Sequence, residues 1–317
     1  MTTTPRPTIF VLGPTAGGKT ELSIELAHRL PGGGACCCAD SMQVYRGMDI
    51  GTAKPNSREQ AAAPHHLIDL VDPGASFSVD DWLSHARPCV DNIKEGNSWP
   101  ILVGGTNLYI QAYLGGFMEG PEPDESLRAD LAEVDPGELR RELERIDPAA
   151  AERIHPNDRR RTVRAIEVFR LTGRTISEMQ VQWASADANA DVLIIGLNWP
   201  VDVINRRINA RVGRMMESGF LDEVQRLHEA GSFGIQSREA LGYKQLLECI
   251  EGRCSLEEAV EQMKILTRRF AKQQRTWLRR FQYFWEGHWI DAAEKPTETI
   301  ANEALAFIDS HHAAPPS

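Results

Sequence analysis

The chain has 317 residues, of which 42% are hydrophobic and 25% are charged. This composition is typical of a soluble globular protein with one large or two smaller domains, and it excludes collagen-like, coiled-coil and wholly disordered chains. The sequence holds 35 Lys and Arg against 45 Asp and Glu, a formal net charge of −10. Taken over the whole chain, that charge argues against a nucleic-acid partner.

The N-terminus and the cysteines carry no targeting or cross-linking signal. Only the run 9–12 is strongly apolar near the N-terminus, which is too short for a signal-peptide core or a membrane span, so we expect a cytoplasmic protein. Of the 6 cysteines, Cys36, Cys37 and Cys38 are consecutive and the others are scattered. Neither a disulfide framework nor a paired zinc pattern appears, and we expect reduced thiols.

The first third of the chain alternates short apolar runs with helical patterns. The runs predict strands at 8–12, 35–39, 66–71 and 101–103. Leucines at 22, 26 and 30 have the spacing of a helix, which ends at the Pro-Gly-Gly-Gly segment 31–34. This order of strand, turn, helix and strand predicts βαβ units in a parallel sheet, and hence an α/β fold of the P-loop type.

The pattern changes after Gly115. Residues 120–190 contain no strand-like run, and the clearest helix, Arg159 to Leu171, ends at Thr172-Gly173. A buried strand at 192–197 and amphipathic helices at 208–227, 240–250 and 256–284 follow. The sequence therefore predicts a catalytic core formed by 1–119 and 191–317 and an all-helical insertion domain at 120–190.

Residues 13–20 match the phosphate-binding pattern G-x-x-x-x-G-K-[ST] between a predicted strand and a predicted helix. Glycines in such a loop let backbone N–H groups surround phosphate oxygens. Lys19 would reach a terminal phosphate, and the Thr20 hydroxyl can bind Mg²⁺. The loop indicates a polyphosphate ligand, of which a nucleotide is the commonest example but not the only one.

Two polar residues follow other predicted strands, Asp40 after the run 35–39 and Thr106 after the run 101–105. Ligands of open parallel sheets bind at the carboxyl ends of the strands, so we expect both residues near the P-loop. The residues alone leave the role of Asp40 open. It fits a general base, a Mg²⁺ ligand of the kind NTPases use, or a turn or helix cap.

Basic residues gather in three stretches, 140–174, 206–214 and 264–280. These stretches hold 21 of the 35 basic residues and 6 of the 45 acidic ones, a net charge of +15 that leaves −25 on the rest of the chain. Such segregation is typical of a polyanion-binding face on an acidic body, whereas any single stretch also fits a solvated helix face. In the third stretch, Phe270, Trp277, Leu278 and Phe281 recur at helical spacing, so we expect the rings inside and the arginines outside.

These segments together resemble one family, the tRNA dimethylallyltransferases or tRNA isopentenyltransferases of the bacterial type. The resemblance runs in family order from residue 9 to about 290, and its most specific part is the string from Asp40 to Pro55. The other resembling segments are 13–20, 102–109, 154–158 with 164–167, 241–244 and 268–277.

The resemblance implies transfer of a dimethylallyl group from dimethylallyl diphosphate to the exocyclic N6 of adenosine 37, beside the anticodon of tRNA, with release of diphosphate. It implies Asp40 as the general base and Thr106 as its partner at the acceptor amine. It implies Mg²⁺ bound through the Thr20 hydroxyl. Nothing in the sequence demands more than a monomer, which is the oligomeric state we expect. The residues implied for the donor diphosphate are Gly13, Thr15, Ala16, Gly17, Gly18, Lys19 and Thr20.

A base stacked in an anticodon loop has to be flipped out to reach such a site. The residues implied for tRNA are Asp40, Ser41, Met42, Gln43, Thr106, Arg128, Arg160, Arg161, Thr162, Val163, Arg164, Gly242, Tyr243 and Lys244. One of them departs from the family, because Arg160 stands where members often carry Gln. This change puts a base contact in question and adds affinity for phosphate.

Three other functions remain open on the residues alone. A small-molecule kinase or NTPase would use Asp40 for Mg²⁺, but it leaves the arginine-rich insertion unexplained. A non-catalytic RNA-binding module would keep a vestigial P-loop, but it leaves Asp40 and Thr106 unexplained. An isopentenyltransferase acting on free adenylate shares the core chemistry, and the insertion is the main feature that separates it from the tRNA enzymes.

Overall fold

The computed structural model describes residues 6–115, 120–122, 124–181 and 191–312. The chain divides into two compact units, one formed by Met1–Ile110 with Asp191–Ser317 and the other by Gln111–Ala190. The first unit holds a parallel sheet, and the described residues of the second are helical. Each unit is described by itself below.

The sheet of the first unit has 6 strands in the order β3-β2-β4-β1-β5-β6. All paired strands are parallel, and β1 is central because Ile9 is in register with Ile101 of β4 on one side and Leu193 of β5 on the other. The strands are β1 (Thr8–Leu12), β2 (Gly34–Cys38), β3 (His65–His66), β4 (Trp99–Val103), β5 (Val192–Asn198) and β6 (Gly287–Asp291). This sheet confirms the α/β fold that the sequence predicts.

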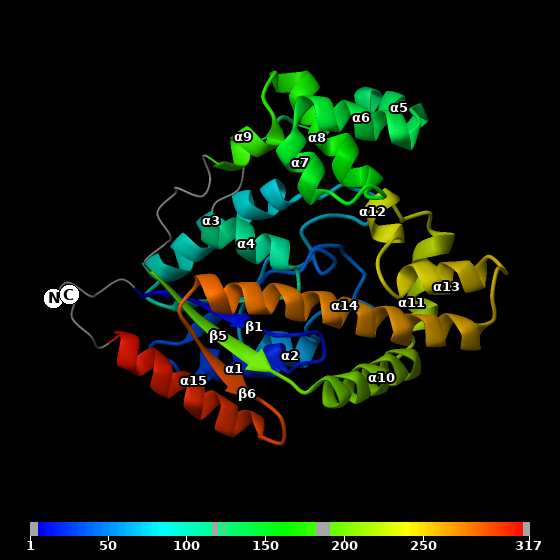
Figure 1. Cartoon of the computed structure of the whole chain (residues 1–317). Helices are drawn as coiled ribbons and strands as arrows, with labels where there is room; N and C mark the ends of the chain where they lie inside the picture. Colours follow the sequence, from blue (N-terminus) through cyan, green and yellow to red (C-terminus); the bar gives the residue numbers. More distant parts are fainter. Residues whose placement is uncertain (1–5, 116–119, 123, 182–190, 313–317) are drawn as a thin grey trace. The chain divides into compact units, whose positions relative to one another are not determined.

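Helices cover both faces of this sheet. On one face, α1 (Lys19–Arg29) and α15 (Thr297–His312) pack against each other and against alternate strand residues such as Val11 and Cys36 (Figure 1). The next residue, Cys37, points to the opposite face, where Cys89 of α3 (Val79–Glu95) lies 3.8 Å from it, sulfur to sulfur. Burial on both faces explains why the strands are continuous apolar runs rather than alternating ones.

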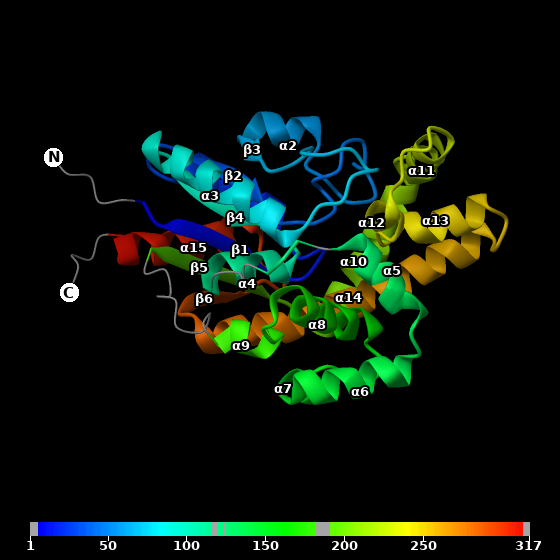
Figure 2. The ribbon, with the colours of Figure 1, turned by 90° about the horizontal axis from the view of Figure 1, so that it is seen from above.

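The rest of the first unit is helical. α10 packs on α14 through Ile204, Ile208 and Ala271, and α11, α12 and α13 gather at one end of the unit (Figure 2). These helices are α2 (Ser57–Ala62), α10 (Val201–Glu217), α11 (Phe220–Glu229), α12 (Ile235–Arg238), α13 (Tyr243–Ile250) and α14 (Leu256–Phe284). α4 (Asn107–Gly115) crosses the boundary between the units.

The second unit has its own small core. Leu131, Leu139, Leu143 and Ile166 are all fully buried in it. The helices are α5 (Glu125–Glu133), α6 (Pro136–Ile146), α7 (Pro148–Arg153), α8 (Arg159–Thr172) and α9 (Ile176–Val181). α8 begins at the predicted residue and ends one residue after the predicted Leu171, where Gly173 takes a left-handed conformation with φ 71°.

Two sequence-based expectations about elements are wrong, and one strand was not predicted. The strand predicted at 66–71 shrinks to the two residues of β3, because Leu67 and Asp69 have φ of 64° and 54° and leave the extended conformation. The single helix predicted at 208–227 is two helices, since Gly219 with φ 91° ends α10 and starts α11. β6, which extends the sheet beyond β5, had no counterpart among the predicted strands.

Candidate active site

The P-loop forms at the carboxyl end of β1, as the motif predicts. Gly18, with φ 85°, lets the chain turn into α1, and the Gly17 N–H donates to the Pro14 carbonyl at 3.1 Å. The Lys19 ammonium lies over the loop and donates to the carbonyls of Gly13 and Pro14 at 3.1 and 2.9 Å. Burial and the nearby Arg211 lower the pKa of Lys19 to about 8, against the raising effect of Asp40 and Glu21.

The loop is braced by side chains that are distant in sequence. Gln274 of α14 accepts from the Thr15 N–H at 2.8 Å and donates to the Gly105 carbonyl at 3.0 Å. Trp199 donates its indole N–H to the Gly17 carbonyl at 3.0 Å. Because Gln274 uses the Thr15 N–H, the hydroxyl is the group through which Thr15 faces the cavity.

Asp40 and Thr106 lie on neighbouring segments at the ends of β2 and β4. The Thr106 N–H donates to the Ala39 carbonyl at 3.1 Å, and the Thr106 hydroxyl accepts from the Ser41 N–H at 2.9 Å and donates to the Ser41 hydroxyl at 3.2 Å. Asp40 Oδ1 accepts from the Met42 N–H at 2.9 Å, which fixes the orientation of the carboxylate. Only glycine fits at 104, since a Cβ there would lie 2.1 Å from the Ala39 carbonyl oxygen.

Three arginines of α10 line the same cavity as the P-loop, which has a volume of about 780 Å³: Arg207, Arg211 and Arg214. Arg207 donates to the Ala16 carbonyl at 2.8 Å, and Arg211 reaches the Thr15 hydroxyl at 3.5 Å. Burial lowers the pKa of Arg211. The sequence analysis placed these residues only in a general basic stretch, although their spacing puts them on one helix face and could have identified them as a group.

A second cavity of about 270 Å³ meets the first at Asp40. It is mostly apolar and also exposes Thr106 and Ser41. Its apolar side chains are Met42, Ile208, Val212, Met215, Phe220, Leu241, Tyr243, Met263 and Phe270. The residues that line both cavities are Thr15, Asp40, Thr52, Arg211, Met215 and Phe270. The cavity that holds the P-loop and its three arginines and the apolar cavity therefore share one carboxylate, Asp40.

The aromatic rings of α14 do not all follow the expectation. Leu278 and Phe281 are buried and Trp277 is half-buried, as predicted. Phe270 is 40% exposed and faces both cavities instead of the core. Its helical spacing could not distinguish a ring that lines a cavity from one that fills the core, because both lie on the inward side of the helix.

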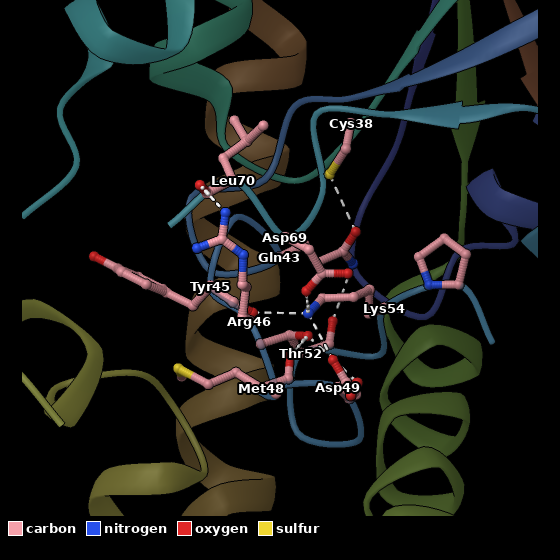
Figure 3. A network of polar contacts seen from close by, with 12 residues as sticks. Cys38, Gln43, Tyr45, Arg46, Met48, Asp49, Thr52, Lys54, Asp69 and Leu70 are labelled. Atoms are coloured by element: carbon pink, nitrogen blue, oxygen red, sulfur yellow. Dashed lines mark hydrogen bonds and ion pairs between the residues drawn. The ribbon is translucent and has the colours of Figure 1, made fainter. Parts of the chain in front are cut away.

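Several residues expected to contact tRNA form hydrogen bonds or ion pairs with other residues of the first unit. The Gln43 amide donates to the Thr52 and Ala53 carbonyls at 3.1 and 3.2 Å and accepts from the Cys38 thiol (Figure 3). Tyr243 is fully buried, although its ring borders the apolar cavity together with Gly242. Lys244 is more exposed and forms an ion pair with Glu239 at 2.6 Å.

In the second unit, the basic residues of α5 and α8 have different environments. The fully buried Glu167 accepts from Arg128 at 2.8 Å and from Arg164 at 2.6 Å. Arg160 and Arg161 have exposed side chains, and the latter makes an ion pair of 3.5 Å with Asp158. The other two tRNA candidates in α8 turn inward, Thr162 being buried and Val163 packed against the core of the unit.

None of the helices in the described part of the chain is both long enough and apolar enough to cross a membrane. The described residues also contain no group of three or more His, Cys, Asp and Glu side chains able to hold a metal ion by themselves.

Comparisons with known proteins agree on one family. A family model described as IPP transferase matches residues 43–281. The chain is 43% identical to tRNA dimethylallyltransferase 2 of Geotalea uraniireducens, over 95% of this chain and 96% of the relative. It is 46% identical to tRNA dimethylallyltransferase of Geobacter sulfurreducens, over 86% and 88% of the two chains.

Solved structures give the same result. The tRNA isopentenylpyrophosphate transferase of Bacillus halodurans is 39% identical with a TM-score of 0.72, over 98% of this chain and 97% of that chain. A eukaryotic dimethylallyltransferase acting on tRNA is 27% identical with a TM-score of 0.84, over 98% and 80%. The chain therefore belongs to the IPP transferase family of tRNA dimethylallyltransferases and is a prenyltransferase.

Proposed function

We propose that this protein transfers the dimethylallyl group of dimethylallyl diphosphate to N6 of adenosine 37, beside the anticodon of tRNA, and releases diphosphate. The observation that carries the proposal is the meeting, at Asp40, of an apolar cavity and the cavity lined by the P-loop and the α10 arginines. The donor has a strongly anionic end and a hydrocarbon end, so it matches both spaces. The apolar cavity would have no use in transfer of a phosphoryl group between two polar substrates.

The donor diphosphate binds in the P-loop cavity. Thr15, Ala16, Gly17 and Gly18 line the space for the phosphates, and the positive charges of Lys19, Arg207 and Arg211 offset those of the ligand. The Gly13 carbonyl contributes by accepting from the Lys19 ammonium. As the bond between the allylic carbon and the diphosphate oxygen breaks, negative charge grows on that oxygen. Cations fixed in place before the reaction stabilise this charge without the cost of reorienting solvent.

The residues beside the P-loop fit a bound Mg²⁺. Mg²⁺ commonly binds through one or two protein groups together with substrate phosphates, rather than in a cage of carboxylates. Thr20, whose side chain lines the P-loop cavity next to Lys19, supplies such a group. When bound there, the ion adds positive charge that favours departure of the diphosphate.

Asp40 acts as the general base at the acceptor. The lone pair of the adenine amine is delocalised into the ring, so the amine is a poor nucleophile. Removal of its proton as the carbon–nitrogen bond forms makes it a better one, and such assistance contributes about 10²- to 10⁴-fold in rate. The Met42 N–H holds Asp40 Oδ1, whereas no described residue donates to Oδ2, which accepts the proton.

Binding of tRNA uses residues of both units. Arg160 and Arg161 have exposed guanidinium groups suited to backbone phosphates, and the segment 242–244 contributes at the apolar cavity. The adenine is flipped out of the loop so that its amine reaches Asp40. Ser41 and Thr106, whose hydroxyls are hydrogen-bonded to each other, line the apolar cavity together with Asp40.

Incubation of the purified protein with dimethylallyl diphosphate, Mg²⁺ and an unmodified tRNA carrying adenosine 37 tests the proposal. We expect isopentenyladenosine in the digested tRNA by mass spectrometry, and none with a matched tRNA that has guanosine at this position. Asp40→Asn keeps the bond from Met42 and should lower the single-turnover rate by about 10²- to 10⁴-fold while inorganic diphosphate still binds. Hydrolysis of ATP without any prenylated nucleoside would contradict the proposed reaction.

A further inference from the structure

A buried carboxylate lies behind the wall of the apolar cavity. Glu223 of α11 is 7% exposed and accepts four hydrogen bonds. Its Oε2 accepts from the N–H groups of Asp49 and Ile50 at 3.0 and 2.8 Å. Its Oε1 accepts from the Gly51 N–H at 3.2 Å and from the Tyr243 hydroxyl.

Three consecutive backbone N–H groups that point at one anion form a nest. Without the carboxylate, these partly buried N–H groups would lose their hydrogen-bond partner, so the conformation of the turn 49–51 depends on Glu223. The carboxylate equally depends on the turn, because a buried charge needs every oxygen satisfied. Glu223 and the turn therefore stabilise each other, although they come from opposite halves of the chain.

Glu223 and the turn 49–51 together determine the shape of the apolar cavity. Gly51, Thr52 and Tyr243 line the cavity, whereas Glu223 itself lines neither cavity. The turn lies so close to the facing helix that a Cβ at Gly51 would be 2.1 Å from the ring of Phe220. A small shift of the turn therefore changes the space available to a ligand beside Asp40.

A second anchor holds the same turn from the chain that follows it. The buried Lys54 donates to Asp49 and Asp69, both at 2.6 Å, and to the Tyr45 carbonyl at 2.7 Å (Figure 3). The Lys54 contacts hold the Asp49 side chain but none of the three N–H groups. Loss of Glu223 would thus loosen the backbone at 50–51 while the rest of the segment stays attached.

We propose that Glu223 is a positioning residue for prenyl transfer. It holds the turn 49–51 and Tyr243 so that the allylic carbon and the acceptor amine meet at Asp40. It acts through the cavity wall and does not touch the reacting atoms. Misplacement of reactants by about 1 Å can cost on the order of 10²-fold in rate. The inference rests on the proposed function for its assay, whereas the hydrogen bonds stand without it.

The test compares Glu223→Gln with Glu229→Gln, a change at an exposed carboxylate on the same helix that accepts from the neighbouring Gln225. Glutamine keeps the size of the side chain but turns an amide NH₂ toward N–H donors. We expect kcat to fall by about 10- to 100-fold in Glu223→Gln, with the affinity for inorganic diphosphate within about 2-fold of the parent. Glu229→Gln should match the parent in both measurements.

Equal kcat values for Glu223→Gln and the parent would overturn the proposal. So would a loss of diphosphate affinity as large as the loss of kcat in a folded Glu223→Gln protein, since that result means a role in donor binding rather than in positioning. If Glu223→Gln does not fold, Tyr243→Phe carries the test, because it removes one donor and leaves the nest intact. A kcat several-fold below the parent with unchanged diphosphate affinity is then expected, and an unchanged kcat would refute the role. A parent protein without product would instead contradict the proposed function.

Discussion

At the scale of single residues, the protonation state of Lys19 affects how the donor binds. Burial of its ammonium and the nearby Arg211 lower its pKa to about 8, whereas Asp40 and Glu21 oppose this shift. Before the donor binds, a substantial share of Lys19 is therefore neutral at slightly alkaline pH. A bound diphosphate brings negative charge to the ammonium and favours its protonated form. Donor binding is thus coupled to proton uptake by Lys19.

This coupling predicts a pH dependence of diphosphate binding. Below pH 8 Lys19 is charged and binding needs no proton, whereas above pH 8 each binding event must first protonate it, so the affinity falls as the pH rises. Calorimetric titration with inorganic diphosphate between pH 7 and about pH 9 measures the effect. Lys19→Ala should bind more weakly at pH 7 and lack this component, while ionisation of diphosphate itself affects both proteins. Parallel pH profiles for the two proteins would contradict the coupling.

At the scale of elements, the second unit depends on one buried carboxylate. Glu167 of α8 accepts from Arg128 of α5 and from Arg164, and its Oε1 also accepts from the Asp124 N–H at 2.9 Å. Burial would raise the pKa of Glu167, but these hydrogen bonds outweigh burial and hold it below its usual value. Arg128 and Arg164, which the family resemblance implies as tRNA contacts, therefore stabilise the fold of the unit.

Glu167→Gln should lower the free energy of unfolding at pH 7 by about 2 kcal/mol, somewhat less than a fully buried ion pair, because both arginines remain partly exposed and can regain water. The lowered pKa means that this stabilisation is fully present above the usual glutamate pKa and is lost as the pH falls through the folded value. Urea unfolding at pH 7 and pH 4 checks both points.

The control for this prediction is Glu138→Gln, an exposed carboxylate whose ion pair with Arg141 measures 4.0 Å. Such a surface pair contributes at most about 1 kcal/mol, so the control should stay close to the parent. If the two variants lose the same stability at pH 7, or if Glu167→Gln retains the acid sensitivity of the parent, the carboxylate does not hold the unit together.

At the scale of the whole molecule, the basic side chains divide into those that line the P-loop cavity and those that are exposed to RNA. The net charge of −10 makes general affinity for nucleic acid unfavourable, so tRNA binding has to rely on a limited set of cationic side chains. The structure removes part of the basic stretch 206–214 from that set, because Arg207, Arg211 and Arg214 line the P-loop cavity. The exposed Arg160 and Arg161 remain available to RNA phosphates.

Removal of one phosphate contact should change the salt dependence of tRNA binding. Arg161→Ala should reduce the slope of log affinity against log salt by about 1. Arg29→Ala on α1, outside the basic stretches, is the matched control and should leave the slope unchanged. Affinity measured from low to physiological salt, with an unrelated RNA of equal length in parallel, gives both slopes. Identical slopes for the two variants would exclude Arg161 from the phosphate contacts.

The sequence by itself determined the features that depend on neighbouring residues. The P-loop follows from a local spacing of glycines, Lys19 and Thr20, and Asp40 and Thr106 are found at strand ends because each directly follows an apolar run. The string from Asp40 to Pro55, together with the other resembling segments, identified the family that the comparisons confirm. These patterns extend over about 20 residues or fewer, so they can be recognised without any knowledge of the fold.

Only the tertiary structure decided which distant segments share a site. Gln274 bonds to the loop 259 residues before it, and Glu223 bonds to a turn 174 residues before it, so no local pattern could reveal either contact. The same holds for Gln43 and Tyr243, whose polar groups are satisfied inside the protein. Burial and hydrogen bonding are properties of a position in space. A polar residue exposed to RNA and one that holds a cavity wall therefore look alike until the chain is folded.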